Sequence, residues 1–213
     1  MTPDLAELTA RARALVARTA AGGRRRAFLG IAGPPGAGKS TLAAVLVAAL
    51  DADTPRLAVG VPMDGFHLAQ VELARLGRAE RKGAPDTFDA AGYVALLRRL
   101  HDEAGTVYAP AFRRDLEEPL AGAVPVEPAA RLVVTEGNYL LVDDGDWAAV
   151  RPLLDEVWYV DTDPARRVAE LVRRHEQHGR SPAQARRWVE RSDEANARLV
   201  AATAHRADLR VLR

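Results

Sequence analysis

The chain has 213 residues, with 30 basic and 29 acidic side chains and no cysteine. This length fits one domain with a full core, and the balance of charge argues against a general nucleic-acid binder. The lack of cysteine excludes disulfides, thiol nucleophiles and cysteine-ligated zinc. Residues 1–20 mix acids and arginines with short apolar spacings, unlike a signal peptide or a membrane span, so we expect a cytoplasmic protein with no membrane partner.

Short apolar runs alternate with helical periods along the chain, after an amphipathic N-terminal segment that ends at Gly22 and Gly23. Strands and helices in alternation predict a doubly wound α/β fold, with four or five parallel strands and helices on both faces. The predicted strands span 27–33, 56–63, 131–137, 156–161 and 208–212. The predicted helices span 3–21, 39–50, 67–77, 89–103, 163–178 and 181–203.

Two helix starts carry strong local signals. Asp163 precedes Pro164 and is placed to cap the helix that follows, and Ser181 stands three residues before Gln184 in a capping-box pattern. Residues 106–128 are rich in proline and polar residues and are expected to form an irregular excursion with short β-like pieces and a candidate hairpin, suited to a substrate loop.

The segment 33–40 reads GPPGAGKS and matches the phosphate-loop pattern in full, between a predicted strand and a predicted helix. Its glycines let backbone N–H groups face phosphate oxygens, while Lys39 reaches the β- and γ-phosphates and Ser40 holds Mg²⁺. Lys39 is one of only two lysines in a chain that otherwise uses arginine. The loop predicts ATP and Mg²⁺ as cofactors. The ATP-binding residues expected from it are Gly33, Pro34, Pro35, Gly36, Ala37, Gly38, Lys39, Ser40 and Thr41.

Acidic residues end two of the other predicted strands. Asp64 follows the strand at 56–63, and Glu136 ends the strand at 131–137. Because the carboxyl ends of parallel strands share one edge, both acids should converge with Lys39 around a nucleotide. Asp64 would then accept a proton from an attacking hydroxyl, and Glu136 would lie near Mg²⁺. The plainer alternatives are a turn residue for Asp64 and a solvated acid for Glu136.

A GTPase is disfavoured, because the chain has no N-K-x-D tetrad on a late strand. The D-x-x-G at 102–105 ends a predicted helix rather than a strand.

Taken in order, GPPGAGKST, MDGFHL, RKGAPDTFD, VVTEGNYLL and VDTD, with an arginine-rich helix after them, resemble the phosphoribulokinase/uridine kinase superfamily over residues 28 to about 212. The superfamily includes uridine kinases, type I pantothenate kinases and bacterial nucleoside/nucleotide kinase or fructokinase-like proteins. The resemblance implies a P-loop kinase domain over 24–213, behind an N-terminal helix at 1–23, with a mobile helical lid at about 163–192. It implies Asp64 as the base, Glu136 as the magnesium-side acid, Phe88 and Asp89 at the acceptor site, and Arg173, Arg174 and Arg180 in the lid. Arg180 is also an expected ATP-binding residue.

Within that resemblance the acceptor is not fixed, because the stretch YAPAFRRDLEEP keeps Tyr108 but lacks the tyrosine-and-histidine pattern by which uridine kinases hold the pyrimidine. RKGAPDTFD is closer to pantothenate kinases. The remaining candidates each have a plain structural alternative, such as packing for His67 or a solvated charge run for the arginines. The candidates for acceptor binding are Phe66, His67, Lys82, Phe88, Asp89, Tyr108, Arg113 and Arg114.

The segment 83–93 bears on what the acceptor is. Gly83 and Pro85 predict a turn, and Asp86 or Thr87 is expected to cap the following helix, which would leave Asp89 in its first turn. A carboxylate there could accept from two neighbouring hydroxyls and reject an acceptor that lacks one. This favours a ribonucleoside or a sugar as the acceptor.

We therefore expect an ATP-dependent kinase that phosphorylates a hydroxyl of a nucleoside, sugar or related polyhydroxylated metabolite. Lys39, Asp64, Arg173 and Arg174 are the expected catalytic residues, and Ser40 and Glu136 the metal-side residues. A pantothenate-type kinase or a nucleotide kinase is the alternative within enzymes. A regulator that hydrolyses ATP to switch partners is the alternative of another class. Nucleic acid is not an expected partner, and a homodimer is left open.

Overall fold

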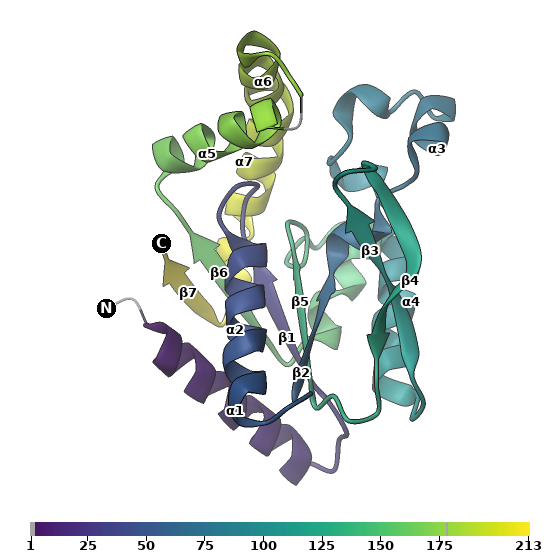
Figure 1. Cartoon of the computed structure of the whole chain (residues 1–213), viewed down its shortest axis with the longest axis vertical. Helices are drawn as coiled ribbons and strands as arrows, with labels where there is room; N and C mark the ends of the chain where they lie inside the picture. The colour runs from purple at the N-terminus through teal and green to yellow at the C-terminus, as the bar shows by residue number, and fades with distance from the viewer. Residues whose placement is uncertain (1–2, 178) are drawn as a thin grey trace.

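A five-stranded parallel sheet with the strand order β2-β5-β1-β6-β7 forms the centre of the computed structural model, which describes residues 3–177 and 179–213. Helices cover both faces, so the predicted doubly wound α/β class is confirmed (Figure 1). The strands are β1 (Ala27–Ala32), β2 (Ala58–Pro62), β5 (Leu132–Gly137), β6 (Glu156–Asp161) and β7 (Leu209–Leu212). The helices are α1 (Leu5–Ala21), α2 (Lys39–Asp53), α3 (Gln70–Arg75), α4 (Ala90–Asp102), α5 (Pro164–Gln177), α6 (Pro182–Trp188) and α7 (Glu194–Ala202).

The central strand β1 supplies both halves of the core, since all six of its residues are buried. Phe28 and Ala32 face the side covered by α4, whereas Leu29 and Ile31 face the side covered by α1 and α2. A strand buried on both faces reads as a continuous apolar run, which is why the strand was clear in the sequence.

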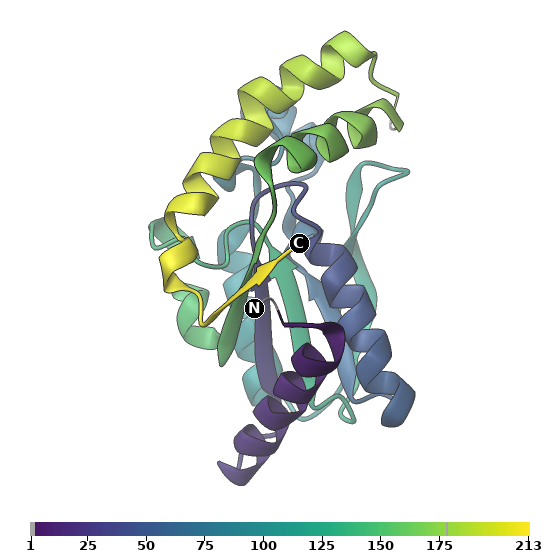
Figure 2. The ribbon, with the colours of Figure 1, turned by 90° about the vertical axis from the view of Figure 1, so that its left-hand side faces the viewer.

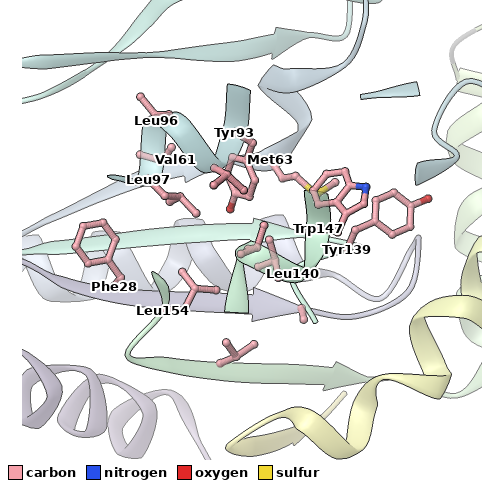
Figure 3. Packing of buried hydrophobic residues seen from close by; sticks show 14 of the residues in the cluster. Phe28, Val61, Met63, Tyr93, Leu96, Leu97, Tyr139, Leu140, Trp147 and Leu154 are labelled. Carbon is pink, nitrogen blue, oxygen red and sulfur yellow. The ribbon is translucent and has the colours of Figure 1, made fainter. Parts of the chain in front are cut away.

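Aromatic rings fill the α4 side of the core near the upper edge of the sheet. Trp147 packs against Tyr139 with ring centroids 5.3 Å apart, and Met63 and Tyr93 lie close by (Figure 3). The Tyr93 hydroxyl is buried and is 2.6 Å from Oγ1 of Thr135, so its polar end is paired. This packing fixes the turn after β2 and the loop after β5, the two places where the predicted site residues lie.

Helix α1, predicted at 3–21, lies in the same core cluster as the sheet. Leu8, Ala12 and Leu15 are buried with residues of β1 and α2. Glu156 of β6 is also buried, and it pairs with two arginines of α1. The helix is therefore held on the sheet by apolar packing and by a buried carboxylate. Residues 1 and 2 of the predicted segment 1–23 lie outside the described residues.

The region 106–128, expected to be an irregular excursion with a candidate hairpin, is an antiparallel hairpin with a register shift between Ala109 and Ala111. Strands β3 (Val107–Arg113) and β4 (Glu118–Val126) pair with each other and form a separate two-stranded sheet. Proline is tolerated in such a sheet because each strand has an outer edge with no ladder to complete. The prolines that obscured the strands in the sequence are Pro110, Pro119 and Pro125.

Two predicted helices are shorter or broken. The segment 67–77 contains a helix only at α3, after a 3₁₀ turn at Met63–Phe66. The segment 181–203 is divided into α6 and α7 by a π-helical turn at Val189–Asp193. Figure 2 shows α6 and α7 curving over the top of the molecule, with α5 beneath them.

The predicted helix starts at Asp163 and Ser181 are confirmed. Oδ1 of Asp163 accepts from the backbone N–H of Arg166 at 2.9 Å, and Ser181 forms a capping box with Gln184. Residue 178, the last of the predicted helix 163–178, lies outside the described residues.

Arg26, just before β1, joins the bottom of the fold. Its guanidinium is buried and donates to four backbone carbonyl oxygens, at 3.0–3.2 Å. Two of these belong to Leu100 and Glu103 at the end of α4, where helix carbonyls lack partners within the helix. The other two belong to Glu127 and Ala130, in the loop before β5. One side chain thus ties α4 to the entry of β5.

We predict that Arg26→Met lowers the free energy of unfolding by about 2–4 kcal/mol, because it leaves several buried carbonyls without their charged donor. Urea unfolding followed by circular dichroism measures the change. Arg25→Met is the matched control, because the adjacent Arg25 is exposed and donates to the single carbonyl of Ala104. Equal losses in the two variants would contradict the role given to Arg26.

Candidate active site

The segment 33–40 forms a tight loop between β1 and α2, as its pattern predicts. Gly36 and Gly38 have φ values of 78° and 87°, in the left-handed region that favours glycine. At Gly36 a Cβ atom would also lie 2.7 Å from Cγ of Leu171 in α5. Helix α2 begins at Lys39, so its positive N-terminal end faces the space above the loop, a favourable position for an anion.

Lys39 is buried beneath that space. Its Nζ donates to the main-chain oxygen of Pro34 at 3.0 Å and to Oδ1 of Asn138 at 2.7 Å. Burial lowers the pKa of Lys39 to about 8, and attraction by Glu136 and Asp64 opposes this effect. The ammonium group is therefore held at a fixed place and stays only weakly hydrated, which strengthens its interaction with a phosphate.

Glu136 and Ser40 form the second polar pair of the site. Ser40 Oγ donates to Oε1 of Glu136 at 2.9 Å. Burial, followed by repulsion from Asp64, raises the pKa of Glu136 to about 7. A hydroxyl and a carboxylate beside a phosphate loop are hard oxygen donors of the kind Mg²⁺ takes, together with substrate phosphates. The residues therefore fit the expected magnesium ion, with Ser40 and Glu136 as its protein side.

Asp64 lies at the same edge of the sheet, in the 3₁₀ turn that follows the neighbouring strand β2. The register pairs Glu136 with Pro62 on one side and with Ile31 of β1 on the other, which brings the three strand ends together. Gly65 allows the hairpin to approach, since a Cβ atom there would lie 2.4 Å from the main-chain oxygen of Pro110. Asp64 Oδ2 is 3.4 Å from Nη2 of Arg114 in the hairpin turn.

Two cavities open at this edge of the sheet. The first, which we call the Asp64 cavity, has a volume of about 250 Å³ and extends from Asp64 to Lys82, Trp188 and Asn196. The second, the loop cavity, has a volume of about 350 Å³ and lies between the phosphate loop, Arg166 and Arg213.

Most of the predicted site residues meet at these cavities. The predicted residues that line the Asp64 cavity are Pro35, Gly36, Lys39, Ser40, Asp64, His67, Lys82, Phe88, Arg114, Glu136, Arg174 and Arg180. Ala37, Gly38 and Thr41 line the loop cavity. Gly33 and Pro34 shape the loop beneath, where the oxygen of Pro34 holds Lys39.

Two of the lining side chains pack against aromatic rings. The His67 ring lies 4.0 Å from that of Phe88 and 4.7 Å from that of Phe112, and burial lowers its pKa, which favours the neutral form. The Arg180 guanidinium lies 3.7 Å from the centroid of the Trp188 ring.

Besides Gly33 and Pro34, the structure places five predicted residues outside both the Asp64 cavity and the loop cavity. Phe66 packs into the core against Tyr93, and Tyr108 is exposed on the hairpin. Arg113 pairs with Asp115, and Arg173 pairs with Glu170, both on the surface. The arginine directly after each of the last two, Arg114 or Arg174, lines both cavities instead.

Asp89 is the fifth, and it corrects the expectation for 83–93. Asp89 itself is the N-cap of α4, and its exposed carboxylate accepts from the backbone N–H of Gly92 at 2.8 Å. The predicted caps, Asp86 and Thr87, make other contacts instead. Asp86 pairs with Arg78 and Arg81, and Thr87 donates to the oxygen of Ala84. Oδ1 of Asp89 is therefore used by the helix start.

Sequence reasoning missed several residues that line the Asp64 cavity. Asn138 follows Glu136 by two positions at the same strand end, and that spacing could have identified it. Glu117 lies in the hairpin turn. His175 of α5 and Asp193 of the π-helical turn form a pair, with His175 Nε2 2.8 Å from Asp193 Oδ2. No spacing in the sequence reveals this pair, because only the folding back of α7 over α5 creates it.

A phosphate loop with a buried lysine, a serine and two strand-end acids defines a P-loop phosphotransferase. Comparison with known proteins gives the family: the model of the Phosphoribulokinase / Uridine kinase family matches residues 28–213, and the chain belongs to this family. It is accordingly an ATP-dependent kinase of a small molecule.

Three relatives illustrate the similarity. "Putative uridine kinase C227.14" of Schizosaccharomyces pombe is 35% identical over 160 residues, which cover 71% of this chain and 67% of that protein. A pantothenate kinase of Leifsonia xyli is 34% identical over 62% of this chain and 42% of its own length. The crystal structure described as a "putative fructose transport system kinase", from Silicibacter sp. TM1040, is 36% identical, covers 98% of both chains and has a TM-score of 0.87.

Across residues 3–177 and 179–213, none of the helices combines the length and the apolar character needed to cross a membrane.

We predict that Asp89→Ala lowers the free energy of unfolding by about 1 kcal/mol, because it removes the cap of α4. Asp89→Asn, which still caps, should keep most of the stability. Thermal unfolding of both variants, alongside the KM for an active acceptor, gives the measurement. A raised KM in both variants would restore an acceptor role for Asp89.

We also predict that Glu136→Gln stabilises the ligand-free protein at pH 8. The folded-state pKa of about 7 lies above the ordinary value of 4.5, so ionisation favours the unfolded chain and stability falls as the pH rises through 7. The difference amounts to at most about 3 kcal/mol. The gain should shrink as the pH falls and vanish near pH 4, below the ordinary value of 4.5, where Glu136 is neutral in both the folded and the unfolded chain. Glu127→Gln on the surface is the control, and a gain independent of pH would contradict the prediction.

Proposed function

We propose that this kinase transfers the γ-phosphoryl group of Mg-ATP to a hydroxyl group of a small polyhydroxylated metabolite, a nucleoside or a sugar. The observation that carries the proposal is the position of Asp64. Its carboxylate lines a polar cavity that opens onto the phosphate loop, so a hydroxyl bound there would lie between the acid and the phosphates.

The residues divide into donor-side and acceptor-side groups. Lys39 and the loop backbone would bind the β- and γ-phosphates, and Ser40 with Glu136 would hold Mg²⁺, which reduces the negative charge of the phosphates. Asp64 takes the proton of the acceptor hydroxyl while that oxygen forms a bond to phosphorus. The bond from phosphorus to the bridging oxygen breaks, and ADP leaves with the electron pair. Arg174 supplies positive charge to the transferring group.

The lining of the Asp64 cavity supports a hydroxyl-rich acceptor. Besides Asp64 it offers Glu117, Asp193 and Asn196, whose side-chain oxygens accept hydrogen bonds, and neutral His67. Several acceptor oxygens in one small cavity suit a ligand with several hydroxyl groups. Vicinal hydroxyls would be recognised by these groups rather than by Asp89, which caps α4 through Oδ1 and does not line the cavity.

Three alternatives remain open to test. The similarity to a pantothenate kinase keeps a pantothenate-type acceptor in the panel. A nucleotide kinase needs a second phosphate pocket. Arg113, one of the two predicted acceptor-binding arginines, pairs with Asp115 away from the cavities. A regulator that only hydrolyses ATP would show basal hydrolysis that no small metabolite accelerates.

The experiment is ATP consumption against a panel of nucleosides, sugars, pantothenate and their phosphates, with Mg²⁺ present. With an active acceptor, Asp64→Asn should lower kcat about 10²-fold or more while ATP still raises the melting temperature, because a positioned base is lost and the phosphate site is intact. Asp115→Asn is the control, since Asp115 is an exposed acid of the hairpin turn.

Lys39→Ala is the complementary variant and should lose the stabilisation by ATP. Near-normal turnover of Asp64→Asn would return Asp64 to the role of a turn residue. Hydrolysis that no member of the panel accelerates would favour the regulator.

A further inference from the structure

The two cavities share five lining residues, and these mark the passage between them. Three belong to the phosphate loop: Gly36, Lys39 and Ser40. The other two are arginines, Arg114 and Arg174. A phosphoryl group that moves from a nucleotide in the loop cavity to a hydroxyl beside Asp64 has to cross this passage.

The two arginines reach the passage from separate parts of the fold. Arg114 lies in the turn between β3 and β4, and Arg174 lies in α5. In Figure 1 the hairpin and α5 stand on opposite sides of the sheet edge. The passage is therefore bounded on two sides by guanidinium groups, one from the β3–β4 hairpin and one from α5.

Positive charge is crowded at the passage. Arg114 and Arg174 both act to lower the pKa of Lys39, and Arg114, after burial, lowers the pKa of Arg174. Like charges at short range are unfavourable until an anion lies between them. The anionic γ-phosphoryl group is the ligand that this position suits, because guanidinium donors match its oxygens in pairs.

The ion pair of Arg114 with Asp64 is weak. The atoms are 3.4 Å apart, and the Arg114 and Asp64 side chains are 46% and 27% exposed. Partly exposed pairs of this kind contribute about 0–1 kcal/mol, less than charge-assisted hydrogen bonds to a phosphate in a partly dry site. An arriving phosphoryl group can therefore take Arg114 from Asp64, which leaves the carboxylate able to receive a proton.

We propose that Arg114 is a catalytic residue that acts with Arg174 as a two-sided clamp on the transferring phosphoryl group, and that it leaves Asp64 when that group arrives. This assignment rests on the proposed function and moves Arg114 from the acceptor to the phosphoryl group. During transfer the phosphorus–bridging-oxygen bond breaks as the bond to the acceptor oxygen forms. The guanidinium groups neutralise charge on the three equatorial oxygens meanwhile.

The chain supplies matched controls for both halves of the clamp. Arg113 and Arg173 stand next to Arg114 and Arg174 in sequence, but neither lines a cavity, and each pairs with an exposed acid, Asp115 or Glu170. Replacing them with alanine removes the same side chain from the same element. Arg114→Lys keeps a positive charge and removes the paired donors.

The test compares the binding of ADP and of AMP-PNP, a nonhydrolysable ATP analogue, by calorimetry with Mg²⁺ and no acceptor. The ratio of the two affinities reports the contact with the third phosphate. Arg114→Ala and Arg174→Ala should each reduce the AMP-PNP affinity relative to ADP by about tenfold or more, with Arg114→Lys in between. Arg113→Ala and Arg173→Ala should leave the ratio unchanged. An unchanged ratio in Arg114→Ala overturns the proposal.

A second measurement separates the clamp from acceptor binding. With an active acceptor, Arg114→Ala should lower kcat about 10²-fold or more and leave the acceptor KM nearly unchanged. A raised acceptor KM with normal kcat overturns the proposal and makes Arg114 an acceptor-binding residue. The binding test needs no acceptor, so a panel without any active compound would count against the proposed function alone.

Discussion

The parallel pairing of β2, β5 and β1 is the constraint on which the site depends. It places Pro62, Glu136 and Ile31 side by side in register, so that Asp64, Glu136 and the phosphate loop follow from neighbouring strand ends. Apolar packing on both faces of the sheet holds these strands in place. The positions of the strands therefore bring the site residues together, without a need for contacts between those residues. The chemistry of the site is thus a consequence of the order of strands in the sheet.

The edge carries charges that burial makes costly. Lys39 and Glu136 are both buried. Burial favours the neutral form of each side chain, so the pKa of Lys39 falls to about 8 and that of Glu136 rises to about 7. Ser40, Asn138 and the oxygen of Pro34 reduce this cost without removing it. Such a site gains when phosphates and a cation bind, because each new charge is opposite to one already held there. The free energy that these buried charges cost the ligand-free protein therefore contributes to its affinity for charged ligands.

The elements above the sheet edge define what can enter. The hairpin β3–β4 and the helices α5 to α7 close the Asp64 cavity from different sides, and Lys82, Arg114, Arg174 and Arg180 come from these elements and from the loop before α4. The family includes relatives named for different acceptors, a putative uridine kinase and a pantothenate kinase among them.

The sequence by itself determined the α/β class, the order of the elements, the phosphate loop and the acids at two strand ends, because these depend on local patterns and on the rule that parallel strands end at one edge. It also determined the caps at Asp163 and Ser181, which are contacts over three residues. Only the tertiary structure decided that Asp89 caps α4, that Arg114 and Arg174 rather than Arg113 and Arg173 reach the site, and that His175 meets Asp193. Side chains one position apart on a hairpin or a helix point in different directions, and their targets are fixed by packing between elements distant in the chain.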